Sequence, residues 1–324
     1  MISNGEIRKY VTERIKPFRT KVFGYSMVYF IIISAISSAI MSVIYAITSL
    51  IGAGIGLVLQ SITGSYEVVQ MTSSISNSLS SIIQIVLYLL VFILSVGFMK
   101  EILLCVNEKD KTSPVDFFRL GFQNYKKLIK VYFRMYLKYL LASIVMVIGI
   151  PFIIIGCIMF SEELGLAVVG IILLLIGFFF VLAGSIISII IFLQHQTLNY
   201  DYIYDEKDLS SKDLVKMARE NIKGYVWQWT KMNFFYKVIF FFAFLALILI
   251  LGLLIFVSSM IITAQNGVAT VVAIIFMILA LVLFIGGIIA ISIFMNYFEA
   301  KNILNLNELY KMIIKEKQGQ MVNS

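Results

Sequence analysis

The chain has 324 residues, of which 60% are apolar and 14% charged, and its formal net charge is +8. Soluble domains average about 45–50% apolar and about 25% charged residues, so this composition excludes an ordinary soluble domain. The excess of Lys and Arg does not indicate nucleic-acid binding, because these cations flank long uncharged stretches, as orienting cations flank membrane helices.

The uncharged stretches divide into six segments that are long enough to cross a bilayer, whose hydrocarbon core requires about 20 helical residues. They lack the polar and apolar alternation of membrane β-strands. In chain order the predicted spans are residues 25–51, 79–98, 136–160, 164–193, 238–263 and 268–297. The sequence therefore predicts an all-α polytopic membrane protein with six transmembrane helices.

The basic residues predict the orientation of these spans. All 26 Lys and Arg fall in segments on one side of the predicted membrane, namely residues 1–21, 99–138, 194–237 and 296–324. Segments on the other side carry only Glu67, Glu162 and Glu163 as charged residues. Because cytoplasmic loops are enriched in Lys and Arg, we expect a plasma-membrane protein with both termini in the cytoplasm.

The first pair of spans is joined by residues 52–78, which are rich in Ser, Thr, Asn, Gln and Gly. We expect a flexible, solvated loop here, and specificity toward an external molecule is the alternative. Gly52 and Gly56 form a pair of small residues four positions apart, which favours close helix packing over contact with a substrate. Pro151, in the third span, is expected to bend its helix, either for packing or to expose backbone to a cavity.

Three basic segments share a pattern that predicts the start of a helix. In each, a serine is followed three residues later by a carboxylate, so that both side chains can accept hydrogen bonds from the first helical turn; the pairs are Ser3 and Glu6, Ser113 and Asp116, and Ser210 and Asp213. Apolar residues follow at three- or four-residue spacing, which indicates amphipathic helices lying in the headgroup region. The cations expected to contact anionic headgroups are Lys9, Arg14, Lys16, Arg119, Lys126, Lys127, Lys130, Lys216 and Lys223.

Each predicted interfacial helix precedes two spans, so the chain reads as three repeated hairpin units. Their boundaries are residues 1–98, 99–193 and 194–298, followed by a cytoplasmic amphipathic tail at 299–324, all within one membrane domain. The alternative is that the likeness of the three segments is fortuitous, because any cytoplasmic segment leading into a membrane helix tends to be basic and capped.

Three stretches resemble a family of uncharacterised bacterial integral membrane proteins of unknown function. They are GFQNYKKLIKVYFRMYL at 121–137, the Ile150 and Pro151 pair, and LNYDYIYDEKDLSSKDLVKMARENIKGYVWQW at 198–229. Lys223, Gly224 and Tyr225 match the family pattern of Lys-Gly followed by an aromatic residue, whereas Phe152 stands where the family prefers glycine. The resemblance covers roughly half the chain and implies a six-span architecture without an assigned activity.

No pattern of catalytic, cofactor-binding or metal-ligating residues is evident. The single histidine, His195, is expected to lie at the membrane interface, with pH sensing as the alternative, and Cys105 and Cys157 lack metal-ligand spacing. We therefore expect a non-enzymatic protein without cofactors that acts as a scaffold, accessory or protective component with lipid and membrane-protein partners. The alternative is a transporter or flippase of an apolar or amphiphilic small molecule.

Overall fold

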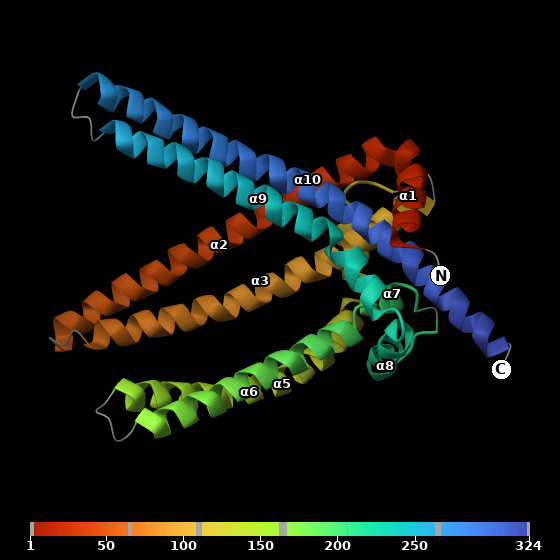
Figure 1. The fold of residues 1–324 in the computed structure, drawn as a ribbon, viewed down its shortest axis with the longest axis horizontal. Coiled ribbons are helices and arrows are strands. Elements are labelled where there is room, and N and C mark those ends of the chain that lie inside the picture. Colours follow the sequence, from red (N-terminus) through yellow and green to blue (C-terminus); the bar gives the residue numbers. More distant parts are fainter. Residues whose placement is uncertain are drawn as a thin grey trace. The chain divides into compact units, whose positions relative to one another are not determined.

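The computed structural model describes residues 3–63, 67–107, 112–161, 167–205, 207–262 and 267–322, and every regular element within them is helical (Figure 1). In chain order the elements are α1 (Asn4–Ile15), η1 (Lys16–Phe18), α2 (Arg19–Thr63), α3 (Glu67–Asn107), α4 (Asp116–Phe122), α5 (Tyr125–Ser161), α6 (Ala167–Gln194), α7 (Leu198–Ile203), α8 (Ser211–Ile222), α9 (Val226–Ile262) and α10 (Gly267–Val322).

Six helices are long and apolar enough to cross a membrane: α2, α3, α5, α6, α9 and α10. Large apolar side chains are exposed along them, such as Leu175 at 65% and Leu249 at 65%. In a bilayer these side chains would face lipid, which is as apolar as they are. The prediction of an all-α chain is confirmed for the described residues, as is that of six helices able to span a membrane, whereas their arrangement as three hairpins stays a prediction.

The loop expected at residues 52–78 is largely wrong, because α2 continues to Thr63 and α3 begins at Glu67. Hydroxyl side chains in a helix can donate to a carbonyl of the preceding turn, which removes their need for water. Thr48 Oγ1 donates to the Ile44 carbonyl at 2.8 Å, and Ser61 Oγ donates to the Val58 carbonyl at 2.7 Å. A serine- and threonine-rich composition is therefore compatible with helix here. The predicted packing at Gly52 and Gly56 lies outside the side-chain surroundings that the structure describes.

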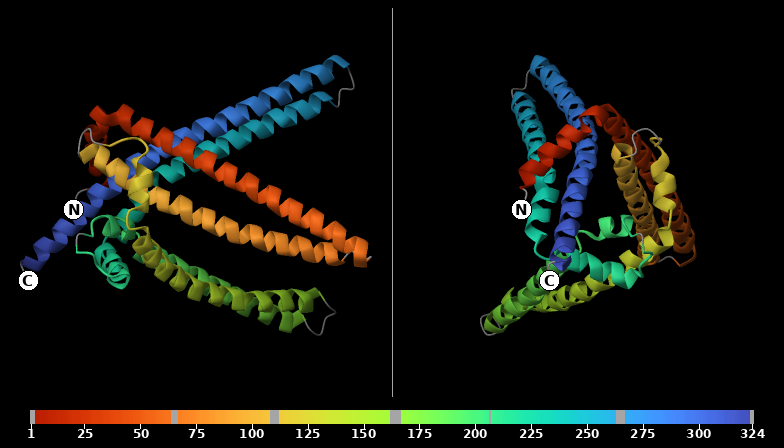
Figure 2. Two further views of the ribbon diagram at one scale, coloured as in Figure 1. Left: turned by 180° about the vertical axis from the view of Figure 1, so that it is seen from behind. Right: turned by 90° about the vertical axis from the view of Figure 1, so that its right-hand side faces the viewer.

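The chain forms two compact units, which are described separately. Unit 1 comprises the described residues among 1–7, 124–233 and 306–324, and unit 2 those among 8–123 and 234–305. In unit 2, α9 and α10 run side by side (Figures 1 and 2), with 5.2 Å between the ring centroids of Tyr236 and Phe298. α10 is 56 residues long, so the described part of the tail predicted at 299–324 belongs to the same helix as the last predicted span.

In unit 1, α5 and α6 pack through glycines along their lengths (Figure 2). The buried residues of α6 are Gly170, Gly177 and Gly184, whose seven-residue spacing places them on one face. A Cβ atom added at Gly177 would lie 2.7 Å from the Gly149 carbonyl oxygen, and one at Gly170 would lie 2.9 Å from that of Gly156. The two backbones therefore touch at positions where only glycine fits.

In unit 2, the short helix α4 packs on the C-terminal half of α3 in the same manner. A Cβ atom at Gly97 would lie 2.6 Å from the Gly121 amide nitrogen, and one at Gly121 would lie 2.7 Å from the Ile93 carbonyl oxygen. Phe117 of α4 is completely buried, and its ring meets that of Tyr29 edge to face with 5.2 Å between centroids. Backbone contact and aromatic packing together hold α4 in one orientation on α3.

The three serine and carboxylate pairs all lie at the starts of helices. Before α1, the Ser3 amide donates to Glu6 at 2.8 Å and the Glu6 amide donates to Ser3 Oγ at 3.2 Å, as the capping box predicts. Ser210 is the N-cap of α8, and its Oγ accepts from the Asp213 amide at 3.3 Å. α4 differs because its N-cap is Val115, so the helix begins two residues later than a cap at Ser113 would predict.

The apolar faces of α1 and α8 are covered by protein. Ile7, Val11 and Ile15 of α1 are buried, as are Leu214, Val215, Ala218 and Ile222 of α8. The sequence pattern predicts that these two helices lie in the headgroup region. Their apolar residues instead pack against other parts of the protein. The side chains that these helices leave exposed include the charged Lys9 and Lys216.

Candidate functional site

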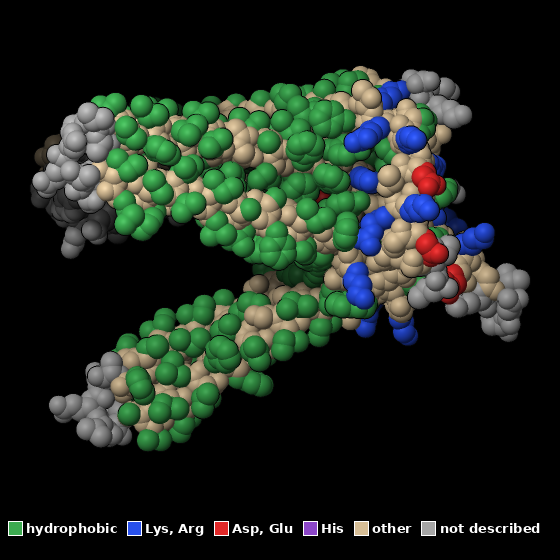
Figure 3. All heavy atoms as spheres, turned by 45° about the horizontal axis from the view of Figure 1, so that its top comes forward, with side chains coloured by type: hydrophobic (Ala, Val, Ile, Leu, Met, Phe, Trp, Pro, Cys, Tyr) green, Lys and Arg blue, Asp and Glu red, His purple; other side chains and the backbone are tan. Residues whose placement is uncertain are grey.

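Cations gather at one end of the long apolar helices in each unit considered separately (Figure 3). Of the nine cations predicted to contact headgroups, seven are exposed: Lys9, Lys16, Arg119, Lys126, Lys130, Lys216 and Lys223. The other two have protein partners and are partly buried. Arg14 donates to Asn107 Oδ1 at 2.7 Å, and Lys127 is bound by two carboxylates.

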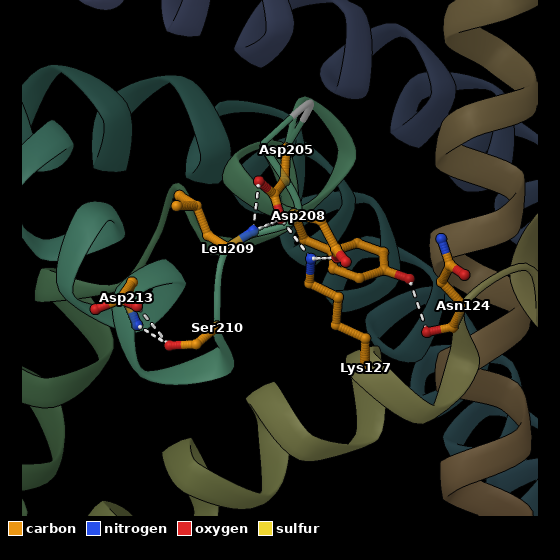
Figure 4. A network of polar contacts seen from close by, with 8 residues as sticks. Asn124, Lys127, Asp205, Asp208, Leu209, Ser210 and Asp213 are labelled. Atoms are coloured by element: carbon orange, nitrogen blue, oxygen red, sulfur yellow. Dashed lines mark hydrogen bonds and ion pairs between the residues drawn. The ribbon is translucent and has the colours of Figure 1, made fainter.

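Lys127, in the first turn of α5, ties this helix to the segment between α7 and α8 (Figure 4). Its Nζ donates to Asp205 at 2.5 Å and to Asp208 at 2.6 Å. The Asp205 side chain is 2% exposed and also accepts from the Leu209 amide at 3.0 Å, whereas Asp208 is 94% exposed. The bond and charge of Lys127 lower the pKa of Asp208. Lys127 therefore neutralises a buried carboxylate, which makes it a structural cation.

Two residues with left-handed backbone conformation allow these segments to meet. Asn124, between α4 and α5, has φ 60°, and its carbonyl accepts a hydrogen bond of 3.2 Å from the Tyr202 hydroxyl. Asp208 has φ 48°. Asn and Asp tolerate this conformation better than most residues with a Cβ atom. Asn124 and Asp208 thus contribute through their backbone conformation as well as through their polar groups.

A second polar cluster surrounds Asp201 of α7, which is completely buried. Asn221 Nδ2 of α8 donates to Asp201 Oδ1 at 2.6 Å, and the Tyr310 hydroxyl of α10 donates to the same oxygen at 3.0 Å. Burial raises the pKa of Asp201 to about 6, and the hydrogen bonds from its neighbours oppose that rise. Asp201 therefore joins three helices through one buried acid that titrates near neutral pH.

The last part of α10 packs on α7 around this acid. The Tyr310 ring stacks on Tyr204 with 5.6 Å between centroids and an interplanar angle of 10°. The Tyr204 hydroxyl donates to Asn307 Oδ1 at 2.6 Å. Lys317 Nζ donates to the Glu220 carbonyl at the end of α8. The C-terminal segment of α10 is thus an integral part of unit 1.

His195 is buried in the turn that follows α6. Its Nδ1 lies 2.7 Å from the Ile191 carbonyl oxygen and its Nε2 lies 3.0 Å from Lys138 Nζ. Burial lowers the pKa of His195, so the neutral ring predominates at pH 7, with Nδ1 donating and Nε2 accepting. Both ring nitrogens are occupied by protein partners. Within the described ranges no three His, Cys, Asp or Glu residues are grouped as a metal site would require.

Sequence reasoning missed the contacts that organise this region. Asp205 and Asp208 lie 78 and 81 residues from Lys127, so no local pattern connects them. The glycine contacts did leave a signal, because Gly149 and Gly156 on α5 and the buried glycines of α6 recur at intervals of seven residues. Pro151 lies within α5, which continues past it to Ser161.

No protein-family model matches the chain, and the searches found no matching curated protein or solved structure.

Proposed function

We propose that this chain is a non-enzymatic multi-pass protein of a bacterial plasma membrane that serves as a scaffold, accessory or protective component for lipids and membrane proteins. In this proposal the six spans form three hairpins, both chain ends are cytoplasmic, and α1, α4 and α8 lie at the inner surface of the membrane. The placement of every Lys and Arg on one side of the predicted spans supports this orientation.

The observation that carries the proposal is the set of seven exposed cations beside the apolar helices. A Lys or Arg near an anionic membrane surface contributes about 1 kcal/mol to the attraction. Lys9, Arg119 and Lys216 belong to α1, α4 and α8, whose apolar faces are buried, so each of these cations is held on the surface of its own unit. Such a surface suits the attraction of anionic headgroups.

Three ionisable groups of unit 1 with protein partners support a structural role for its polar region. Lys127 is held by two carboxylates, and Asp201 and His195 have hydrogen-bonding partners within unit 1. Catalytic groups are usually presented to a cleft where a substrate can reach them. Groups that instead join helices to one another favour a non-enzymatic protein.

The proposal is tested by reconstituting the purified protein in nanodiscs of phosphatidylglycerol and, separately, of phosphatidylcholine. We expect a higher unfolding temperature in the anionic lipid at low salt, and we expect this difference to shrink as added salt screens the charges. Equal unfolding temperatures in the two lipids at low salt would refute the proposal.

One observation favours the alternative of a transporter or flippase for an apolar or amphiphilic compound. A cavity of about 350 Å³ that is open at the exposed face of α5 and α6 has an apolar lining: Ile153, Ile171, Leu174, Leu175 and Phe178. Pro151 lies two residues before this lining. Lipid-scrambling and uptake assays in liposomes test the alternative, which predicts flux that changes in Pro151→Ala. Absence of flux across a broad substrate panel would eliminate it.

A further inference from the structure

The outward face of α4 presents a cation beside exposed apolar side chains. The Arg119 side chain is 78% exposed, and Val115 and Phe122 nearby are 48% and 44% exposed. The opposite face is fixed, because Phe117 is completely buried and Gly121 touches the backbone of α3. The backbone that carries the exposed groups is therefore fixed on the surface of unit 2.

A cavity of about 610 Å³ that is open at the surface lies on this face, and residues of α4 and its C-cap line it: Arg119, Leu120, Phe122 and Gln123. This volume falls within the range of about 300–1,000 Å³ that is usual for small-molecule sites. Its lining combines a guanidinium and an amide with two apolar side chains. A ligand that suits this lining carries an anionic group next to an apolar one.

The Arg119 guanidinium retains hydrogen-bonding capacity for such a ligand. Its ion pair with Asp116 is 3.6 Å long, and the same carboxylate also accepts from the Ser113 amide at 2.8 Å. Exposed pairs of this kind contribute about 0–1 kcal/mol. A guanidinium has five N–H donors and binds phosphate in a bidentate manner, so one weak partner does not exhaust it.

The position of α4 along α3 indicates where the ligand comes from. Gly121 packs on Ile93 and Gly97 of α3, and Lys100, three residues after Gly97, is the first charged residue after the uncharged stretch 68–99. Because cations flank the ends of membrane helices, α4 lies beside the end of the uncharged part of α3, near the level at which the phosphates of lipids are concentrated. A free anion in bulk water has less access to this level.

We infer that the α4 cavity binds the phosphate of one anionic phospholipid through Arg119, with Phe122 against the apolar part of the lipid and Gln123 beside the headgroup. This inference rests on the proposed function and adds the site at which lipid is bound. One cavity would select the anionic lipid, rather than the combined charge of all the exposed cations. Arg119 determines affinity for the anionic headgroup.

The test measures equilibrium binding of phosphatidylglycerol, labelled on an acyl chain, to the purified protein in nonionic detergent. Arg119→Gln is compared with Lys216→Gln, a matched control in α8. The Lys216 side chain is 74% exposed and pairs with Glu220 at 3.8 Å, much as Arg119 pairs with Asp116. We expect Arg119→Gln to weaken binding about tenfold to a hundredfold, as loss of a charge-assisted bond does. Lys216→Gln, which removes only a surface charge, should weaken it no more than about fivefold.

Arg119→Lys keeps the charge but loses the bidentate geometry, so we expect its affinity to lie between those of wild type and Arg119→Gln. Equal losses in the two Gln variants would overturn the cavity while leaving charge-based lipid binding intact. Displacement of the lipid by millimolar inorganic phosphate would overturn the assignment to a lipid. A wild-type protein that binds phosphatidylglycerol no better than phosphatidylcholine would overturn both this inference and the proposed function.

Discussion

Gly177→Ala tests the backbone contact between α5 and α6. The added Cβ atom would lie 2.7 Å from the Gly149 carbonyl oxygen and 2.8 Å from the Ile153 amide nitrogen. Ordinary contacts begin at 3.4 Å, so the helices must separate by about 0.6–0.7 Å. Overpacking of this kind costs about 1–3 kcal/mol. It is offset in part by the helix propensity of Ala, which exceeds that of Gly by about 1 kcal/mol.

The matched control is Gly286→Ala in α10, where no heavy atom lies within 4 Å of an added Cβ atom. This variant receives the same gain in propensity without the clash. The assay is unfolding by SDS in mixed micelles, followed by the fluorescence of tryptophan, because Trp229 in unit 1 is 1% exposed. We expect Gly177→Ala to be less stable than Gly286→Ala by about 1–3 kcal/mol. Equal stability of the two variants would show that α5 and α6 do not touch at Gly177.

Three further predictions concern the polar region of unit 1. Because burial raises the pKa of Asp201 from 3.8 to about 6, the free energy of unfolding of unit 1 is greatest below pH 3.8 and falls by about 3 kcal/mol as the pH rises through 6. Hydrogen exchange of residues 306–322, corrected for intrinsic rates, should show this pH dependence in the wild type and lose it in Asp201→Asn. The same pH profile in the variant would show that other groups cause the dependence. Lys127→Met leaves Asp205 buried without its cation and should lower the unfolding free energy by about 3 kcal/mol. The control Lys216→Met should lower it by less than about 0.5 kcal/mol. Similar midpoints of SDS unfolding for the two variants would contradict the ion pair. Ser210→Ala should lower the unfolding free energy by about 1 kcal/mol through loss of the α8 cap, and an equal effect of Ser211→Ala would argue against that cap.

Helix starts were predictable where the interactions are local. Ser3 with Glu6 and Ser210 with Asp213 form the hydrogen bonds that their spacing predicts. Helix ends were less predictable, because residues 52–63 and 67–78 are helical in spite of their polar composition. Hydroxyl groups that bond within their own helix explain this error, since the same residues in water would favour a loop.

The candidate site was only partly predictable. The exposure of Arg119 follows from its place in an amphipathic pattern, whereas the cavity beside it depends on how Gly121 lets α4 approach α3. Lys127 was grouped with the headgroup cations because its two carboxylates are remote in sequence. A charge pattern cannot separate a solvated cation from one that neutralises a buried acid.

The amino-acid sequence by itself determined the class of protein, the six apolar helices and the clustering of cations beside them. These features depend on hydropathy and charge along the chain, and the cost of placing a charge in lipid enforces them residue by residue. Only the tertiary structure decided that glycines join α5 to α6 and that Asp201 joins α7, α8 and α10. Those contacts act over a few ångströms between segments far apart in the chain, so their formation depends on how the helices pack.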